Sequence, residues 1–206
     1  MYIIGLSGTT GSGKSEACRI FANLGFPIID ADAVYRDLLY PSSPLINKLS
    51  AEFGKAIVDE NGGLNRAALA DIVFSVDGRH THLPRLNAIT HTAILEETEK
   101  RITELEKNGY RYVIFDAPQL FESGFDKKCD TVVVVIANVE IRLQRIMERD
   151  GITEQKAMAR INSQLSDKQL TSMADHTIIN NGTRDELQES VAVVAKKIFN
   201  EVNKNE

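Results

Sequence analysis

The residues with the clearest chemical potential form the octapeptide GTTGSGKS at positions 8–15. It matches the pattern G-x-x-x-x-G-K-[ST], in which glycines let the backbone turn with its N–H groups toward phosphate oxygens. A helix that follows such a loop adds the positive end of its dipole. In this pattern Lys14 reaches the β- and γ-phosphates, and the Ser15 hydroxyl ligates Mg²⁺. The motif predicts a nucleoside triphosphate site, for which the candidate residues are Gly11, Ser12, Gly13, Lys14, Ser15 and Glu16.

The flanking sequence supplies the strand and the helix that this motif requires. Residues 2–7 (YIIGLS) form a short apolar run that predicts a strand. Residues 14–24 (KSEACRIFANL) carry apolar side chains at helical spacing, and Gly25 ends the pattern. Because a strand precedes the motif and a helix follows it, a surface turn rich in glycine and serine is the weaker interpretation.

Further apolar runs predict the rest of a parallel sheet. They lie at 26–32 (FPIIDAD), 110–115 (YRYVIF), 131–137 (TVVVVIA) and 176–180 (HTIIN). The runs are continuous rather than alternating, and helical segments separate them. This organisation is typical of an α/β fold whose parallel sheet is covered by helices on both faces.

The spacing of the strands indicates an insertion. About eighty residues separate the second predicted strand from the third, more than one crossover helix needs. We expect a single unit over 1–206 with a core of 1–32, 108–138 and 166–206 and a helical insertion over 33–107. Residues 139–165 predict two further helices broken at DGIT, with Gly151 as C-cap and Thr153 as N-cap.

Composition limits the classes of partner. Lys and Arg total 24 against 29 Asp and Glu, so the net charge of −5 argues against a nucleic-acid or membrane-surface binder. No run reaches the ~18 apolar residues of a membrane span. The first residues lack the basic region of a secretory signal, so we expect a cytoplasmic location. Cys18 and Cys129 are expected to be reduced thiols. The oligomeric state is left open.

Carboxylates follow two of the predicted strands. Asp30 and Asp32 close the second strand, and in an extended segment residues two apart face the same way. Because such sheets bind ligands at the carboxyl ends of their strands, Asp32 is a candidate general base or hydroxyl-orienting group. The alternative is that either Asp caps a helix beginning near Ala33. Asp116 ends the third strand, where it is either a support for Mg²⁺ or a turn residue.

Three arginines recur at helical spacing within 139–165. Arg142, Arg145 and Arg149 are three and four residues apart and are expected to share a helix face. In an acidic protein this arrangement suggests a lid that closes on polyphosphate. The alternative is a solvated face whose arginines pair with Glu140 and Glu148.

The last predicted strand ends in NNGTRDEL. Thr183 and Glu186 have the spacing of a capping box, so a helix should follow. Asn180, Asn181 and Gly182 then occupy a strand-to-helix turn at the ligand edge, where asparagine amides can bind an adenine edge. A turn selected for its local conformation alone is the alternative.

Among the classes of P-loop protein, a kinase best explains these residues. A switch GTPase needs an N-K-x-D sequence after a strand, and a motor ATPase usually needs a longer chain. A kinase must hold an acceptor hydroxyl in line with the γ-phosphate, neutralise the transferring group and exclude water. Other interpretations are a nucleoside or nucleotide kinase and a regulatory protein that binds ATP without transferring phosphate.

With these residues in place, the chain resembles the dephospho-CoA kinases over essentially its whole length. The resemblance rests on ordered motifs, which are GTTGSGKS, DADAVYRDLL, GGLNRAALADIVF, LNAITHTAI, FDAPQLFESG, RIMERDGITEQKAMARINSQL and ADHTIINNGT. It implies ATP- and Mg²⁺-dependent phosphorylation of the ribose 3′-hydroxyl of dephospho-CoA, the last step of CoA biosynthesis. It also implies a three-layer P-loop kinase fold with a five-stranded parallel sheet, a helical substrate-binding insertion and a helical lid.

The resemblance implies roles for individual residues as well. It places the acceptor-side carboxylate on Asp32. Contacts to the acceptor, or ordering of its pocket, fall on Arg66 and His91, although His91 could also be a helix-packing histidine. The predicted catalytic set is therefore Lys14, Asp32, Arg142, Arg145 and Arg149, with Ser15 and Asp116 at the metal ion.

Overall fold

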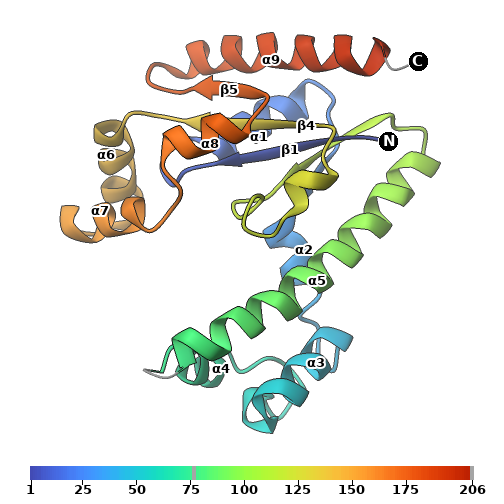
Figure 1. The fold of residues 1–206 in the computed structure, drawn as a ribbon, viewed down its shortest axis with the longest axis vertical. Helices are drawn as coiled ribbons and strands as arrows, with labels where there is room; N and C mark the ends of the chain where they lie inside the picture. The colour runs from blue at the N-terminus through green and yellow to red at the C-terminus, as the bar shows by residue number, and fades with distance from the viewer. Residues whose placement is uncertain (76–77, 205–206) are drawn as a thin grey trace. The chain divides into compact units, whose positions relative to one another are not determined.

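A computed structural model describes residues 1–75 and 78–204 (Figure 1). Residues 76–77, within the predicted insertion 33–107, and 205–206, within the predicted core segment 166–206, lie outside the described residues. The described chain divides into two compact units. One comprises Met1–Ile29 with Leu105–Glu206, and the other comprises Asp30–Glu104.

The first unit is built on a sheet of five parallel strands in the order β2-β3-β1-β4-β5. These strands are β1 (Tyr2–Gly8), β2 (Ile28–Asp30), β3 (Tyr112–Asp116), β4 (Thr131–Ile136) and β5 (His176–Ile179). Leu6 of β1 is in register with Asp116 of β3 and Val133 of β4, so these strands end near one another. The predicted five-stranded parallel sheet is confirmed.

Helices cover both faces of this sheet. Side chains of α1 (Lys14–Asn23) and α9 (Arg184–Lys204) pack on one face, where Phe21 and Val191 join Leu6 in the main core. On the other face lie α8 (Asp167–Met173) and the short helix η2 (Phe125–Lys128), as Figure 1 shows for α8 and α1. Phe125 of η2 packs on Phe115 of β3 with ring centroids 4.3 Å apart. The three-layer prediction is therefore correct.

The predicted helix pair is present as α6 (Val139–Asp150) and α7 (Glu154–Asn162). Gly151 ends α6 in the left-handed conformation with φ 62°, as expected for a C-cap glycine. Thr153 occupies the N-cap position of α7, but its side chain makes no capping hydrogen bond. Ile146, Ala157 and Ile161 form a small apolar core between the two helices.

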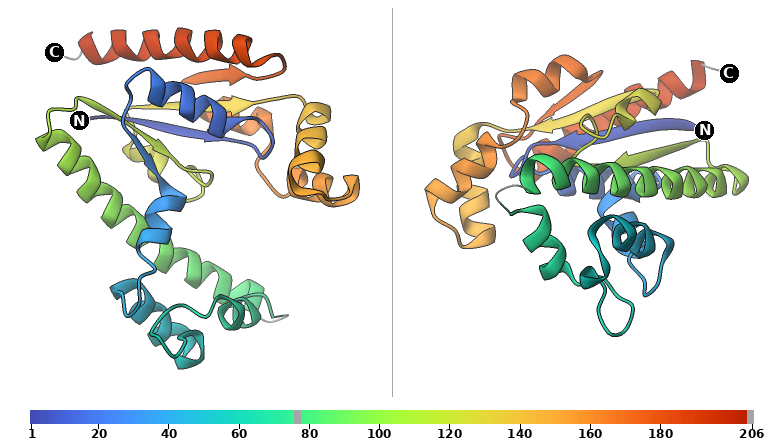
Figure 2. Two further views of the ribbon diagram at one scale, coloured as in Figure 1. Left: turned by 180° about the vertical axis from the view of Figure 1, so that it is seen from behind. Right: turned by 60° about the horizontal axis from the view of Figure 1, so that its bottom comes forward.

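The second unit is helical. It contains α2 (Ala31–Asp37), α3 (Pro44–Phe53), the short helix η1 (Lys55–Ile57), α4 (Arg66–Val73) and most of α5 (Gly78–Lys107), the helix from which the chain continues to β3. Figure 2 shows α3, α4 and α5 from two further sides. The unit has its own apolar core, which includes Leu45, Leu49, Ile57, Leu69 and Val73.

The second strand is shorter than the predicted 26–32, and the expected placement of its two carboxylates is wrong. The strand ends at Asp30, which is the N-cap of α2, and Asp32 already belongs to the helix. The Asp30 carboxylate accepts hydrogen bonds from the backbone N–H groups of Asp32, at 2.8 Å, and of Ala33, at 3.2 Å. Because these bonds satisfy the first turn, the helix begins earlier than Ala33, and Asp30 and Asp32 do not share a face of an extended segment.

Both cysteines are free thiols, as expected. Burial raises the pKa of the Cys129 thiol to about 12. Among the helices that the structure describes, none is long and apolar enough to span a membrane.

Candidate active site

The phosphate-binding motif lies between β1, which ends at Gly8, and α1, which begins at Lys14. Gly11 and Gly13 have φ angles of 77° and 89°, in the region that favours glycine. A Cβ atom at Gly11 would lie 2.8 Å from the Arg142 carbonyl oxygen, and one at Gly13 would lie 2.2 Å from the Asn180 Nδ2 atom. The strand, loop and helix that the motif requires are therefore present, and the loop has room only for glycine at these positions.

The loop borders an open pocket of about 420 Å³. Six of the predicted site residues contribute to its wall, together with residues that follow β3 and α7. The pocket is lined by Gly8, Thr9, Thr10, Gly11, Gly13, Lys14, Ser15, Pro118, Arg145, Arg149 and Gln164. It therefore combines backbone donors, an ammonium group and two guanidinium groups, a set suited to polyphosphate.

Lys14 forms an ion pair with Asp116 at the end of β3. Both side chains are largely buried, with 15% and 11% of their surfaces exposed. The Ser15 hydroxyl and the Asp116 carboxylate are hard oxygen donors, so the residues present fit Mg²⁺. In the part of the chain that the structure describes, no group of three or more His, Cys, Asp or Glu side chains could hold a metal ion.

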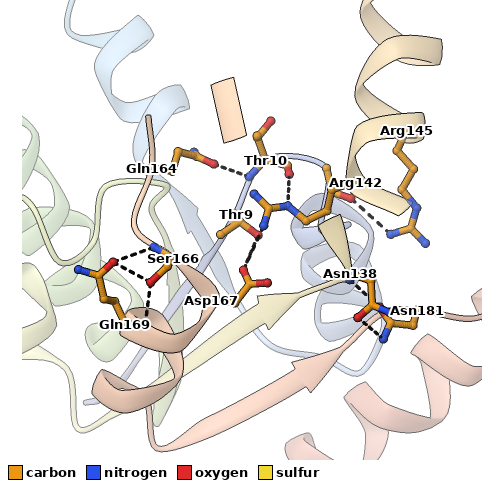
Figure 3. A network of polar contacts seen from close by, with 11 residues as sticks. Thr9, Thr10, Asn138, Arg142, Arg145, Gln164, Ser166, Asp167, Gln169 and Asn181 are labelled. Atoms are coloured by element: carbon orange, nitrogen blue, oxygen red, sulfur yellow. Dashed lines mark hydrogen bonds and ion pairs between the residues drawn. The ribbon is translucent and has the colours of Figure 1, made fainter. Parts of the chain in front are cut away.

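Arg142 differs from the other two arginines of α6. Only 3% of its side chain is exposed, its Nε donates to the Thr10 carbonyl oxygen at 2.9 Å, and its Nη1 donates to the Asp167 carboxylate at 3.1 Å (Figure 3). Burial lowers the pKa of Arg142, and the neighbouring Asp167 charge opposes that shift. Arg142 is thus not on a solvated helix face, which was one of the two interpretations of the sequence.

Arg145 and Arg149 line the pocket but have different partners. Arg145 Nη1 donates to the carbonyl oxygens of Gly11, at 3.4 Å, and Asn180, at 3.2 Å. Arg149 is mostly exposed and binds Asp150 at 2.8 and 2.9 Å. The hydrogen bond from Arg149, with a smaller contribution from Arg160, lowers the pKa of Asp150 to about 2.

The alternative that the arginines pair with Glu140 and Glu148 is wrong for the contacts that the structure describes. The carboxylate partners of Arg142 and Arg149 are Asp167 and Asp150. Glu148 instead accepts a hydrogen bond from Gln144 at 2.9 Å.

The turn after β5 is held to the protein through its asparagine amides. Asn180 is buried, and its Nδ2 donates to the Ser12 carbonyl oxygen at 2.8 Å. Asn181 accepts a hydrogen bond from the Asn138 N–H at 2.8 Å and donates to the Asn138 side chain at 3.1 Å (Figure 3). These contacts give the amides positioning roles in the turn, so the proposed binding of an adenine edge by Asn180, Asn181 or Gly182 stays a prediction.

The capping box that follows this turn is present. The Glu186 carboxylate accepts from the Thr183 N–H at 2.7 Å, and the Thr183 hydroxyl accepts from the Glu186 N–H at 3.3 Å. A Cβ atom at Gly182 would lie 1.6 Å from a Glu186 carboxylate oxygen, so a larger residue there would displace the Glu186 side chain from its position in the box.

Glu16, a predicted nucleotide-binding residue, is bound to arginines on α1 and at the start of α9. Its carboxylate accepts hydrogen bonds from Arg19 and, at 2.8 Å, from Arg184. The Arg19 hydrogen bond is the largest cause of the lowered pKa of Glu16, followed by that of Arg184.

Sequence reasoning missed two residues that bind the loop, Gln164 and Asp167. The Thr10 N–H donates to the Gln164 side chain at 2.7 Å, and the Thr9 hydroxyl donates to the Asp167 carboxylate at 3.5 Å. The S-x-x-Q spacing at 166–169 could have predicted the start of α8, since Ser166 and Gln169 form a capping box. No local signal could have predicted that this helix start lies beside the P-loop.

The predicted acceptor-side residues belong to the second unit. Asp32 is exposed in the first turn of α2, Arg66 is exposed as the first residue of α4, and His91 is half-buried on α5. Burial raises the pKa of Tyr35, and the positive charge of Arg66 opposes that shift. Contact of these residues with an acceptor stays a prediction.

Comparison with known proteins identifies the family. The family model described as dephospho-CoA kinase matches residues 2–186. A dephospho-CoA kinase from Corynebacterium glutamicum is 41% identical over 198 residues, covering 96% of this chain and 100% of the relative.

Solved structures are similar in fold. TT1252 from Thermus thermophilus aligns with a TM-score of 0.77 at 28% identity, over 95% of this chain and 97% of that one. A dephospho-CoA kinase from Campylobacter jejuni aligns with a TM-score of 0.61 at 23% identity, over 95% and 96%. The family match, which extends from the first strand into α9, and the identity over nearly the whole chain lead to one conclusion. This protein belongs to the dephospho-CoA kinase family.

Proposed function

We propose that the protein transfers the γ-phosphoryl group of ATP to the ribose 3′-hydroxyl of dephospho-CoA, producing CoA and ADP in the last step of CoA biosynthesis. The observation that carries the proposal is the P-loop pocket, whose wall holds Lys14, Arg145 and Arg149, in a chain of this family. The proposal includes a cytoplasmic location and a small-molecule substrate, with no nucleic-acid or membrane partner.

The pocket supports electrostatic catalysis of phosphoryl transfer. Charge on the transferring group spreads over its equatorial oxygens, so positive groups fixed around it lower the barrier. Lys14 and the loop N–H groups would hold the β- and γ-phosphates, and Arg145 and Arg149 would neutralise the transferring group. Ser15 and Asp116 would hold Mg²⁺, which would supply positive charge beside the phosphate groups. In this proposal residues 139–165 act as the lid, and 1–32, 108–138 and 166–206 act as the core.

The acceptor side of the proposal rests on the second unit, within the predicted insertion 33–107. Asp32 would orient or deprotonate the 3′-hydroxyl for in-line attack on the γ-phosphorus. Its exposed position in the first turn of α2 leaves its carboxylate accessible to a substrate. Arg66 and His91 would contact the acceptor or order its pocket.

The test is ADP release from ATP and Mg²⁺, with dephospho-CoA, AMP, adenosine and shikimate supplied separately as acceptors. We expect rapid release with dephospho-CoA alone, and mass spectrometry of the product should identify CoA. Release with one of the other acceptors would replace the proposal by another small-molecule kinase. ATP binding without release for any acceptor would indicate a regulatory nucleotide-binding protein.

A further inference from the structure

Three consecutive carbonyl groups of the P-loop are bound by side chains that come from much later in the chain. The Thr10 carbonyl accepts from Arg142 at 2.9 Å, and the Gly11 carbonyl accepts from Arg145 at 3.4 Å. The Ser12 carbonyl accepts from Asn180 at 2.8 Å. The outward-facing oxygens of the loop are therefore fixed by α6 and by the turn after β5.

Fixing a carbonyl also fixes the N–H of the following residue. In a planar trans peptide the C=O and the next N–H point in opposite directions, and no described peptide bond is cis. Bonds to the Thr10 and Ser12 carbonyls therefore direct the N–H groups of Gly11 and Gly13 the other way, as a phosphate-binding nest requires. The Ser12 N–H is used within the loop, where it donates to the Thr9 carbonyl at 3.0 Å.

Thr10 is held at both of its backbone polar groups. Its N–H donates to Gln164 at 2.7 Å, while its carbonyl accepts from Arg142 (Figure 3). Asp167 accepts from Arg142 at 3.1 Å and from the Thr9 hydroxyl at 3.5 Å, so one carboxylate binds both the arginine and the loop. We call these three side chains, from Arg142, Gln164 and Asp167, the Thr10 clamp.

We propose that the Thr10 clamp is a positioning device for the ATP polyphosphate. Its three side chains set the orientation of the loop N–H groups and do not themselves contact the reacting atoms. In this proposal Arg142, one of the predicted catalytic residues, is a positioning residue instead. Asp167 and Gln164 are positioning residues as well. The proposal rests on the proposed function only in taking ATP as the ligand of the P-loop.

The clamp depends on Asp167 because Arg142 is almost completely buried. A buried charge that loses its partner is strongly unfavourable, whereas a satisfied pair can be nearly neutral. An Asp167→Asn variant would weaken the charge-assisted bond and leave Arg142 free to turn away from the Thr10 carbonyl. Gln164 is exposed, so a Gln164→Met variant removes its oxygen from the Thr10 N–H with little risk to folding.

The first experiment measures the Kd of ATP and ADP with Mg²⁺ by calorimetry, together with kcat and the KM of each substrate. Hydrogen bonds to charged groups lead us to expect roughly 10- to 100-fold weaker ATP binding in Asp167→Asn and a smaller loss in Gln164→Met. The KM for dephospho-CoA should stay within about twofold, since the clamp forms its hydrogen bonds to Thr9 and Thr10 of the P-loop and not to the predicted acceptor residues. Matched controls are Asp185→Asn, also in a first helical turn, and Gln188→Met on the exposed side of α9.

A double-mutant cycle then separates positioning from stability. Because Arg142→Gln together with Asp167→Asn leaves no buried unpaired charge, its ATP affinity should fall by less than the product of the two single losses. Unaltered ATP affinity in Asp167→Asn and Gln164→Met, with only the unfolding temperature lowered, would overturn the proposal. Normal ATP binding by the unaltered protein without phosphorylation of dephospho-CoA would instead overturn the proposed function, and the affinity ratios would still test the clamp.

Discussion

Replacing either of two aspartates that lie only two residues apart should affect different properties of the protein, stability in one case and turnover in the other. Asp30 is the N-cap of α2, and its carboxylate binds two backbone N–H groups. Asp32 lies exposed within the same first turn. We expect Asp30→Ala to lower stability, whereas Asp32→Asn should lower turnover and leave the fold almost unchanged.

The size of the stability loss follows from the capping geometry. Replacing an aspartate N-cap by alanine typically costs about 1 kcal/mol. The Asp30 side chain is 45% exposed, so water can partly replace it, and we expect the loss to lie at or below that value. In a chain of this size about 1 kcal/mol lowers the unfolding temperature by roughly 2–4 °C. Asp30→Ser keeps an oxygen at the cap and should recover most of the loss.

The size of the catalytic loss follows from the role proposed for Asp32. A general base contributes roughly 10²–10⁴-fold to rate. Asp32→Asn should therefore reduce kcat by at least about 100-fold with dephospho-CoA, while the Kd of ATP changes little. Its effect on stability is limited to the favourable interaction of a carboxylate with a helix N-terminus, about 0.3–1 kcal/mol.

The assay pairs thermal unfolding with steady-state kinetics for Asp30→Ala, Asp30→Ser and Asp32→Asn. Turnover of Asp32→Asn close to that of the unaltered protein would remove Asp32 from the mechanism. A large loss of kcat in Asp30→Ser, whose helix is still capped, would refute the division of roles and assign chemistry to Asp30 instead.

Three further predictions concern the P-loop and the α6–α7 pair. Asp116→Asn should raise the Mg²⁺ concentration needed for half-maximal rate and lower kcat, because Lys14 loses its carboxylate partner and the proposed Mg²⁺ site would lose a ligand; an unchanged Mg²⁺ titration would contradict this. Gly13→Ala should abolish measurable ATP binding in calorimetry, because the new Cβ would lie 2.2 Å from Asn180 Nδ2 at a φ of 89°. The Asp150 carboxyl should titrate near pH 2 by NMR, below its ordinary 3.8, so its stabilising contribution is present above about pH 4 and is lost as pH falls toward 2; a midpoint near 3.8 would contradict its pairing with Arg149.

The parts of the fold that depend on local pattern were predictable. Continuous apolar runs indicated the five strands, because strands buried on both faces contain few polar residues. Gly151 and the Thr183–Glu186 pair indicated helix ends through chemistry contained within one turn. The second strand was predicted to be too long because the same DAD sequence fits either an extended segment or the start of a capped helix. The two hydrogen bonds from backbone N–H groups to the Asp30 side chain favour the helix.

The sequence indicated which residues could form a site, but not how deeply each of their side chains would be buried. Helical spacing correctly placed Arg142, Arg145 and Arg149 on one helix. It could not show that Arg142 packs against the P-loop and Asp167 while Arg149 stays exposed, since this depends on what lies beside α6. A spacing rule identifies residues that can act together, and only the tertiary neighbours decide which of them remain available to a ligand.

The conformation of the P-loop is likewise not determined by its own sequence motif. The motif states which backbone groups should face a phosphate, but a glycine-rich loop has many other conformations of similar energy. In this chain the choice among them is made by side chains 132 residues later for Thr10 and 168 residues later for Ser12. The glycines give the loop backbone conformational freedom, and the distant side chains restrict it. Replacing Arg142, Gln164 or Asp167 should therefore weaken nucleotide binding even though the motif is intact.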